Sequence, residues 1–332
     1  MKVAKCLLML IFAIPLFTFF PVFGVTAPIE KYPDKTIEVI VPYAPGGPND
    51  IAARVIAEKL AKILKVPVVI VNKAGAGGIL GTSFVARAKK DGYTLLCTNA
   101  APIVSVPVID SQNVNYDVIK DFEPLGRFVY IPVVILVRSD SPYRSFEELA
   151  DFVKKHPEKL NCGIPQIGLG PHLVLETLRS LGLNMTMVVT KGVPENISFL
   201  MGGHVDVTVD SLSSNAGHIR DGKFRPLAIV LEKRFQDFPN IPTLAEKGFP
   251  QATLLFWAGF FAPAGISQDV KNVLVPAIKQ ASVDPETVEK LRKLVFFTEY
   301  AGPEDFRKEI PKMMEIIRDV ATKAGMIKDL KK

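Results

Sequence analysis

Cysteine and histidine are scarce in this chain. It contains 3 Cys and 4 His among 332 residues. Cys97 and Cys162 lie in predicted strands, and so few thiols cannot form the disulfide framework of a chain this long. No His pairs with another His or Cys at the spacing of zinc ligands. We therefore expect no metal site and two buried apolar cysteines, with a bridge between Cys97 and Cys162 left open.

The chain also lacks the basic clusters that nucleic-acid surfaces require. Its formal net charge is +6. No run of five or more basic residues occurs, however, and no repeat interleaves aromatic with basic residues. The mild positive balance agrees with a small anionic ligand. We expect no nucleic-acid partner.

Only one apolar segment approaches the length of a membrane span, and it lies at the N-terminus. Lys2 and Lys5 precede an almost uninterrupted apolar run over 7–23, and small residues follow. This order is typical of a secretory signal peptide. We expect a cut after Gly24, with a cut as late as Ala27 left open. A retained membrane anchor is the alternative interpretation.

Strands alternate with helices in the first part of the mature chain. Apolar, β-branched runs lie at 36–43, 66–72 and 93–99. Apolar residues recur with helical period at 51–64 and 79–88. The alternation predicts a parallel sheet that helices cover on both faces.

A second α/β series follows the first. A long apolar run near 126–138 joins them and contains Pro132. Two series predict two lobes, and bilobal α/β proteins hold small ligands in the cleft at the carboxyl ends of their strands. We expect lobe 1 to comprise 28–128 plus 251–332, and lobe 2 to comprise 129–250.

The loop after the first strand combines glycine, proline and polar side chains. It reads YAPGGPND over 43–50 and opens a helix. We expect positive φ and close ligand approach at Gly46 and Gly47, and an anion at the helix N-terminus. Asp50 has two interpretations. It is either a helix cap or a group that accepts hydrogen bonds from a ligand or a bridging water.

The second loop raises the alternative of nucleotide binding. Gly75, Gly77 and Gly81 match GxGxxxG between a strand and a helix. A dinucleotide site also needs an acidic residue about 20 residues further on, where this chain has Thr98 and Asn99. We therefore expect no nucleotide cofactor. The loop is either a tight turn or a set of backbone N–H groups that line a small-anion site.

Nothing in the sequence assembles a catalytic centre. No GxSxG nucleophile elbow is present. Cys162 and His172 could pair in principle, but Cys162 lies inside an apolar strand. A nucleophile, a base and an oxyanion site are not brought together, so we expect no catalytic residues.

Several segments, in the same order, resemble one protein family. KYPDKTIEVIVPYAPGGPNDIAAR and VVIVNKAGAGGILGTSFVARAKKDGYTLL are similar to the opening of the substrate-binding proteins of tripartite tricarboxylate transporters, the Bug family. MGGHVDVTVDSLSSNAGHI and WAGFFAPAGIS are similar to later parts of these proteins. The resemblance runs from about Tyr32 to Gly325.

The resemblance implies a periplasmic receptor with the bilobal type II periplasmic-binding-protein fold, in which two α/β lobes enclose a ligand cleft. The receptor would not be an enzyme. It would act as a monomer that captures a small organic acid (a di- or tricarboxylate, an acidic amino acid or an aromatic carboxylate) and delivers it to membrane transporter subunits. A ligand sensor for a membrane signalling partner, and an exported enzyme acting on a small acid, are the alternatives.

The resemblance also implies ligand contacts in five loops, where backbone groups and ordered waters would hold the carboxylate. The implied residues are Tyr43, Pro45, Gly46, Gly47, Asp50, Ala76, Gly77, Gly78, Thr98, Asn99, Gly168, Gly170, His172 and Asp210. The chain departs from the family pattern at 189–192, which reads VTKG where similar proteins commonly have Pro-Tyr-Lys-Gly, and at 166–169. The identity of the ligand therefore stays open.

Overall fold

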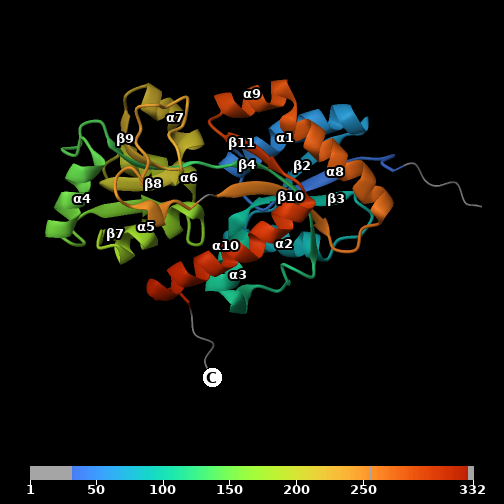
Figure 1. The fold of residues 1–332 in the computed structure, drawn as a ribbon, viewed down its shortest axis with the longest axis horizontal. Coiled ribbons are helices and arrows are strands. Elements are labelled where there is room, and N and C mark those ends of the chain that lie inside the picture. The colour runs from blue at the N-terminus through green and yellow to red at the C-terminus, as the bar shows by residue number, and fades with distance from the viewer. Residues whose placement is uncertain (1–31, 255, 328–332) are drawn as a thin grey trace, which may run out of the picture. The chain divides into compact units, whose positions relative to one another are not determined.

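The computed structural model describes residues 32–254 and 256–327. The expected signal peptide over 1–24 and its cleavage site lie outside these ranges. The described chain forms two mixed sheets, each packed against helices (Figure 1). In this part of the chain, no helix is both long enough and apolar enough to cross a membrane.

The larger sheet has the strand order β11-β4-β10-β3-β1-β2. Its strands are β1 (Ile37–Val41), β2 (Val68–Asn72), β3 (Thr94–Asn99), β4 (Phe122–Tyr130), β10 (Trp257–Pro263) and β11 (Phe297–Ala301). β1 runs parallel to β2 and β3, whereas β10 runs antiparallel to β3 and β4, and β11 antiparallel to β4. The parallel pairing predicted for the first three strands is confirmed, and β10 and β11 add antiparallel pairs to the same sheet. β10 returns from the other sheet at the edge where β3 and β4 end, so it must run against them.

The smaller sheet has the order β7-β6-β8-β5-β9. Its strands are β5 (Val133–Arg138), β6 (Asn161–Ile164), β7 (Thr186–Val189), β8 (Val207–Ser211) and β9 (Phe224–Val230). β6 is parallel to β7 and β8, whereas β5 is antiparallel to β8 and β9. This sheet is built from one continuous part of the chain, coloured green to gold in Figure 1.

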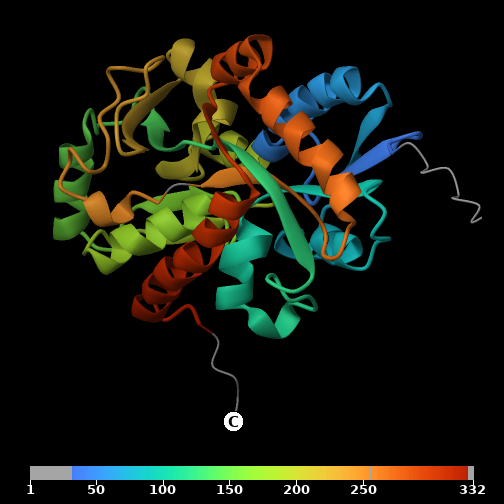
Figure 2. The same ribbon diagram turned by 45° about the vertical axis from the view of Figure 1, so that its right-hand side comes forward.

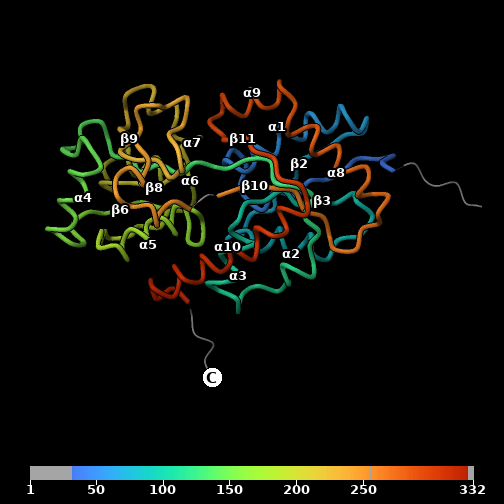
Figure 3. The backbone as a smooth tube through the Cα atoms, viewed as in Figure 1, coloured from blue at the N-terminus to red at the C-terminus, as the bar shows by residue number. Residues whose placement is uncertain are grey.

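The chain crosses between the sheets twice, once between β4 and β5 and once before β10 (Figure 3). The long apolar run predicted near 126–138 thus splits into two strands of different sheets. Pro132 lies at the split, and its missing N–H prevents a continuous strand ladder there. The Ile131 N–H donates a 2.6 Å hydrogen bond to the Phe256 carbonyl. The two crossing segments are therefore tied to each other.

Helices pack on both faces of the larger sheet. They are α1 (Pro48–Leu64), α2 (Ile79–Ala86), α3 (Val106–Ile109), α8 (Gln268–Val283), α9 (Pro285–Lys293) and α10 (Pro303–Lys323). Side chains alternate across β1 with period two: Val39 and Val41 join the cluster formed with α1 and α8, whereas Ile40 joins the cluster formed with α2 and α10. The predicted helical pattern after Asp50 is confirmed as α1.

The smaller sheet packs against four further helices. They are α4 (Phe146–Lys155), α5 (Gly170–Ser180), α6 (Val193–Met201) and α7 (Leu212–Arg220). Ser145 caps α4 by accepting a hydrogen bond from the Glu148 N–H (3.2 Å). This side-chain cap fixes the start of α4.

The C-terminal helix α10 packs against both halves of the molecule. It lies along β4 of the larger sheet and beside α5 of the smaller one (Figure 2). Buried Arg127 on β4 donates to Glu309 of α10 (Nε to Oε2, 3.1 Å). α10 begins at Pro303 and continues through Pro311.

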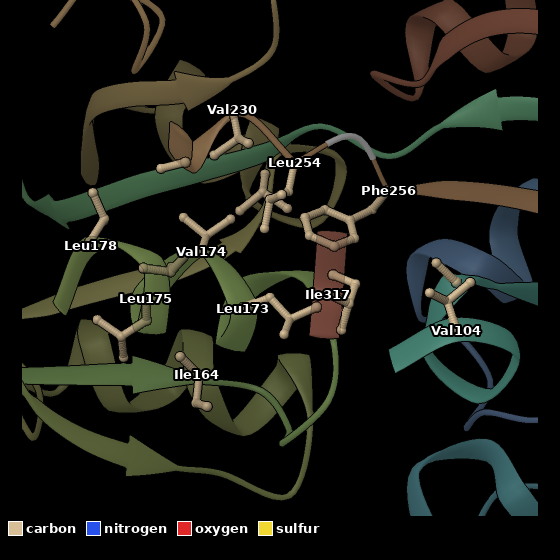
Figure 4. Close-up of a cluster of buried hydrophobic side chains, with 14 of the residues drawn as sticks. Val104, Ile164, Leu173, Val174, Leu175, Leu178, Val230, Leu254, Phe256 and Ile317 are labelled. Atoms are coloured by element: carbon tan, nitrogen blue, oxygen red, sulfur yellow. The ribbon is translucent and has the colours of Figure 1, made fainter. Parts of the chain in front are cut away.

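One apolar cluster extends from the larger sheet through α10 to α5. Figure 4 shows Leu173 of α5, Phe256 of the crossing segment and Ile317 of α10 close together. Their burial fixes the position of α5, whose first turn carries one of the candidate ligand loops. The helices that surround the loops therefore rest on a continuous core.

A glycine on β10 provides a test of this packing. A Cβ at Gly259 would lie 2.5 Å from the buried ring of Phe306 on α10. We expect Gly259→Ala to lower the free energy of unfolding by about 1–3 kcal/mol, because the ring cannot retreat from a packed core. The control is Gly217→Ala on α7, where a Cβ meets no atom within 4 Å and should add about 0.4–1 kcal/mol. Urea unfolding measures both values, and equal stabilities would contradict the close approach.

Candidate functional site

A cavity of about 770 Å³ lies where the loops of the two sheets meet. The larger sheet contributes loops after β1, β2 and β3, and the smaller sheet contributes loops after β6, β7 and β8. Ile131 and Phe256 of the crossing segments also line it. The cavity therefore occupies the place that two α/β lobes predict for a ligand.

Asp50 organises the first loop from behind the cavity. Its carboxylate accepts hydrogen bonds from the Gly46 N–H (2.9 Å), Arg54 Nε (3.0 Å) and Asn72 Nδ2 (2.9 Å). Burial alone would raise the pKa of Asp50, but these hydrogen bonds outweigh burial and hold the pKa below its usual range. The carboxylate fixes the loop to the end of β2, because Asn72 also donates to the Tyr43 carbonyl (3.0 Å).

Asp50 is not the side-chain cap of α1. The N-cap is Gly47, and no side chain caps the helix. Asp50 is absent from the residues that line the cavity. The cap interpretation is therefore wrong, because Asp50 stands inside the first turn and its oxygens reach back to Gly46.

The two glycines of the first loop have different conformations. Gly46 has φ +81°, as expected. Gly47 has φ −75° and ψ 164°, which is extended backbone open to any residue. The expectation of positive φ at Gly47 is wrong. Gly47 lines the cavity. Its lack of a side chain therefore leaves room for a ligand and is not required by the backbone conformation.

Tyr43 connects the first and third loops. Its hydroxyl donates to Asn99 Oδ1 (2.7 Å), and the same oxygen accepts from the Ala101 N–H (2.9 Å). Burial raises the pKa of Tyr43, so the hydroxyl keeps its proton. Neighbouring Asn49 donates through Nδ2 to the Cys97 carbonyl (2.9 Å), while its buried Oδ1 has no partner among the described residues. The lining thus includes an acceptor that an O–H donor, such as a water or a ligand hydroxyl, would satisfy.

His172 shapes the fourth loop rather than the cavity wall. Its Nδ1 accepts a hydrogen bond from the Gly168 N–H (3.1 Å). Burial, aided by the nearby charge of Arg179, lowers the pKa of His172 to about 4. The imidazole is therefore neutral at pH 7 and acts as an acceptor that holds the loop.

Gly170 lines the cavity where the Phe256 ring covers it. A Cβ on Gly170 would lie 2.5 Å from that ring. The close approach seats the ring against the first turn of α5. The fourth loop is thus fixed on one side by His172 and on the other by Phe256.

Asp210 is a fully buried carboxyl at the end of β8. It accepts hydrogen bonds from Asn196 Nδ2 (2.7 Å) and the Ser211 N–H (2.6 Å). Burial raises its pKa to about 7, against the lowering effect of these bonds. It joins the start of α6 to the start of α7, both of which border the cavity.

Five helices begin at the cavity without a side-chain cap. The N-cap residues of α1, α2, α5, α6 and α7 are Gly47, Gly78, Leu169, Gly192 and Ser211, and all five line the cavity. By contrast, α4, α8 and α9 begin at the side-chain caps Ser145, Ser267 and Asp284. α10 also lacks such a cap, away from the cavity. The starts of α2 and α7 are partly satisfied by backbone carbonyls, since the Leu80 N–H donates to Gly75 and the Leu212 N–H to Pro132. Backbone N–H groups at the starts of α1, α5 and α6 remain for a ligand, and helix N-termini favour an anion.

The structure brings half of the predicted contacts to the cavity lining and leaves the other half outside it. Those in the lining are Tyr43, Pro45, Gly47, Gly78, Asn99, Gly170 and Asp210. Those outside the lining are Gly46, Asp50, Ala76, Gly77, Thr98, Gly168 and His172. The second set includes residues that hold the loops in shape.

The sequence analysis missed lining residues of two kinds. One is the segment 190–195 between β7 and α6. Its Lys191-Gly192-Val193-Pro194 repeats the signal of the first loop, in which glycine and proline follow a strand and open a helix, so it could have been found. The other kind comprises Ile131, Val133 and Phe256 at the crossings. The only sequence signal for these residues was the position of Pro132 in an apolar run.

The described residues contain no cluster of His, Cys, Asp and Glu that could hold a metal ion. Cys97 and Cys162 are both buried and free. Burial raises the pKa of each thiol. The two thiols are therefore apolar core groups.

Comparison with known proteins decides the family. The model of the tripartite tricarboxylate transporter family receptor matches residues 52–330. This chain belongs to that receptor family. The family consists of transport receptors, so the chain is a binding protein and not an enzyme.

Solved structures of relatives share the receptor's fold. Periplasmic binding protein BugD is 33% identical, with a TM-score of 0.81, and the match covers 90% of the receptor and 100% of BugD. Rpa4515 of R. palustris, solved with adipate, is 26% identical with a TM-score of 0.84, covering 89% of the receptor and 98% of that chain. MatC of Rhodopseudomonas palustris, with bound malate, is 29% identical with a TM-score of 0.79, covering 87% and 99%. The predicted bilobal periplasmic-binding-protein fold is confirmed.

Removal of the Asp50 carboxylate tests its structural role. We expect Asp50→Ala to lower the receptor's free energy of unfolding by about 2–3 kcal/mol, because three donors lose a charged and buried acceptor. The exposed Asp151 on α4 supplies the control, and Asp151→Ala should change stability by less than about 0.5 kcal/mol. Chemical unfolding at pH 7 measures both. An Asp50→Ala variant as stable as the control would refute the role.

The same carboxylate predicts a pH dependence. Folding lowers its pKa, so its stabilisation is present above the unfolded pKa of about 3.9 and is lost as the pH falls through the lower folded value. We expect the stability difference between the wild type and Asp50→Ala to shrink below about pH 4. Unfolding curves from pH 3 to pH 7 measure this difference, and a constant difference would count against an ionised Asp50.

Proposed function

We propose that the cavity binds a small organic carboxylate and that the loaded receptor delivers it to a membrane transporter. The observation that carries this proposal is the convergence of the N-termini of α1, α5 and α6, free of side-chain caps, at one cavity. Their N–H groups can donate to carboxylate oxygens without an arginine clamp. Relatives solved with adipate and with malate support the same class of ligand.

Residues from both lobes would surround the bound acid. Tyr43, Gly47 and Asn99 contribute from one side, and Gly170 and Lys191 from the other. We propose that 28–128 plus 251–332 form lobe 1 and that 129–250 form lobe 2. A ligand that contacts both lobes binds most tightly when they are closed, so binding shifts the population toward the closed state. The closed receptor would present the surface that the transporter subunits recognise.

We also propose that this receptor works in the periplasm as a monomer, after export by a cleaved signal peptide over 1–24. The location of BugD in the periplasm supports this proposal. A role as ligand sensor for a membrane signalling partner would use the same cavity. Binding measured in the presence of transporter subunits distinguishes delivery from sensing.

Thermal unfolding of the mature receptor tests the ligand class. A carboxylate at about 100 times its dissociation constant should add about 2.7 kcal/mol to the free energy of unfolding. The panel contains mono-, di- and tricarboxylates, each with its uncharged amide as the control. Stabilisation by an acid and not by its amide is the expected result. Equal effects of acids and amides, or stabilisation by none of the acids, would contradict the proposal.

A substitution at the first loop tests the position of the ligand. We expect Gly47→Val to weaken carboxylate binding at least tenfold, because its methyl groups would fill space at the N-terminus of α1. The extended backbone of Gly47 accepts valine, so folding should be retained.

The matched control for this substitution is Gly302→Val. Gly302 is the N-cap of α10, also precedes a proline and has φ −70° and ψ 172°, but it lies outside the cavity lining. Isothermal titration calorimetry compares the two variants. The same affinity in both would show that the first loop is only a turn.

A further inference from the structure

The charges that line the cavity limit the number of carboxylates in the ligand. Among the described lining residues Lys191 is the one cation, and Glu195 and Asp210 are acids. Lys191 and Glu195 are also neighbours, since the Lys191 N–H donates to Glu195 Oε2 (2.5 Å). A ligand with three carboxylates would place three negative charges against a lining without net positive charge. One or two carboxylates fit, held by the helix N-termini and by Lys191.

Most of the remaining lining is apolar. Ile131, Val133 and Phe256 at the crossings form one part, and Leu169 and Val193 at the starts of α5 and α6 form another. Val193 and Leu169 are only half-buried, so their side chains offer apolar surface that a ligand can cover. Thr190 adds no free polar group, because its hydroxyl bonds the carbonyls of Ile164 (3.2 Å) and Gly192 (3.1 Å).

The cavity is also large enough for an acid that carries an apolar body. A volume of about 770 Å³ corresponds to roughly 25 water molecules at about 30 Å³ each. A four-carbon acid would leave much of the apolar lining against water. An apolar body attached to the carboxylate would cover this lining and displace that water.

We propose that the receptor selects carboxylates with an apolar body of about six or more carbon atoms, carried as an aromatic ring or an aliphatic chain. This inference rests on the proposed function and specifies its ligand. The carboxylate lies at the N-terminus of α1. The apolar body extends over Phe256 and Val133 toward Val193, and a second carboxylate, where present, meets Lys191.

Calorimetry with a series of acids tests the selection. The dialysed mature receptor is titrated with succinate, adipate and suberate, and with benzoate and phenylacetate as the aromatic arm; malate and citrate represent small polar acids. Each buried methylene contributes about 0.8 kcal/mol, so we expect affinity to rise about fourfold per methylene from succinate to suberate, or to be highest in the aromatic arm. The arm with the higher affinity identifies the kind of apolar body.

Two other results overturn the inference in distinguishable ways. Malate or citrate binding as tightly as the best apolar acid would overturn the selection but leave the carboxylate receptor intact. Binding of no acid in the series would overturn the proposed function together with the inference.

An isosteric substitution locates the apolar surface. Val193→Thr replaces one methyl group of the lining by a hydroxyl and keeps the shape of the side chain. We expect it to lower the affinity for the best apolar acid about fourfold, which corresponds to the loss of one methyl-sized group. The affinity for succinate should change less than twofold.

The control for this substitution is Val189→Thr, an exposed position on β7 outside the lining. It should change neither affinity. An equal loss for the apolar acid and for succinate in Val193→Thr, or no loss for either, would show that Val193 does not contact an apolar body and would overturn its place in the proposal.

Discussion

The receptor depends on one constraint: the chain passes between its two sheets at a single edge, twice. The Ile131 N–H and the Phe256 carbonyl join the two passages by a hydrogen bond. Because β4 ends at this edge, β10 must start there, which explains why β10 runs antiparallel to both of its neighbours. The same edge carries the carboxyl ends of β1 and β3. Loops, crossings and cavity therefore coincide, and crossing residues become part of the cavity wall.

The polar groups around the cavity have two separate roles, which follow from this arrangement. Asp50 and His172 accept backbone N–H groups of their own loops, so the loops hold their shape without a ligand. No side chain caps α1, α5 or α6 at the cavity, which leaves amides at their first turns available for an anion. Among the described residues that line the cavity, Lys191 is the one that carries a positive charge. Such a receptor would bind acids that carry few charges. The apolar part of its cavity wall would determine which of these acids it prefers.

Much of this architecture could be predicted from local sequence signals. The glycine and proline residues after β1 and β6 marked helix starts at an edge of a sheet, and both lie at the cavity. Apolar, β-branched runs located β1 and β3, and a helical pattern located α1. These signals succeed because turn chemistry and amphipathicity act over a few residues.

Other features depend on contacts between distant segments, and sequence patterns could not reveal them. The directions of β10 and β11 are set by the return of the chain from the other sheet. The short strand β11 has no strong apolar alternation of its own. Asp50 looked like a helix cap because its partners, Arg54 and Asn72, come together only in the folded structure. Phe256 joins the wall through a crossing that no local motif marks.

The position of β10 between β3 and β4 also sets the order in which the receptor can fold. The smaller sheet uses one continuous segment and can form as soon as that segment is available. The larger sheet retains a gap until residues 257–263 arrive, and until then the facing edges of β3 and β4 lack hydrogen-bonding partners. Unpaired strand edges promote association between chains. The last quarter of the chain thus protects β3 and β4 from aggregation, and a chain that ends before β10 would leave those edges exposed.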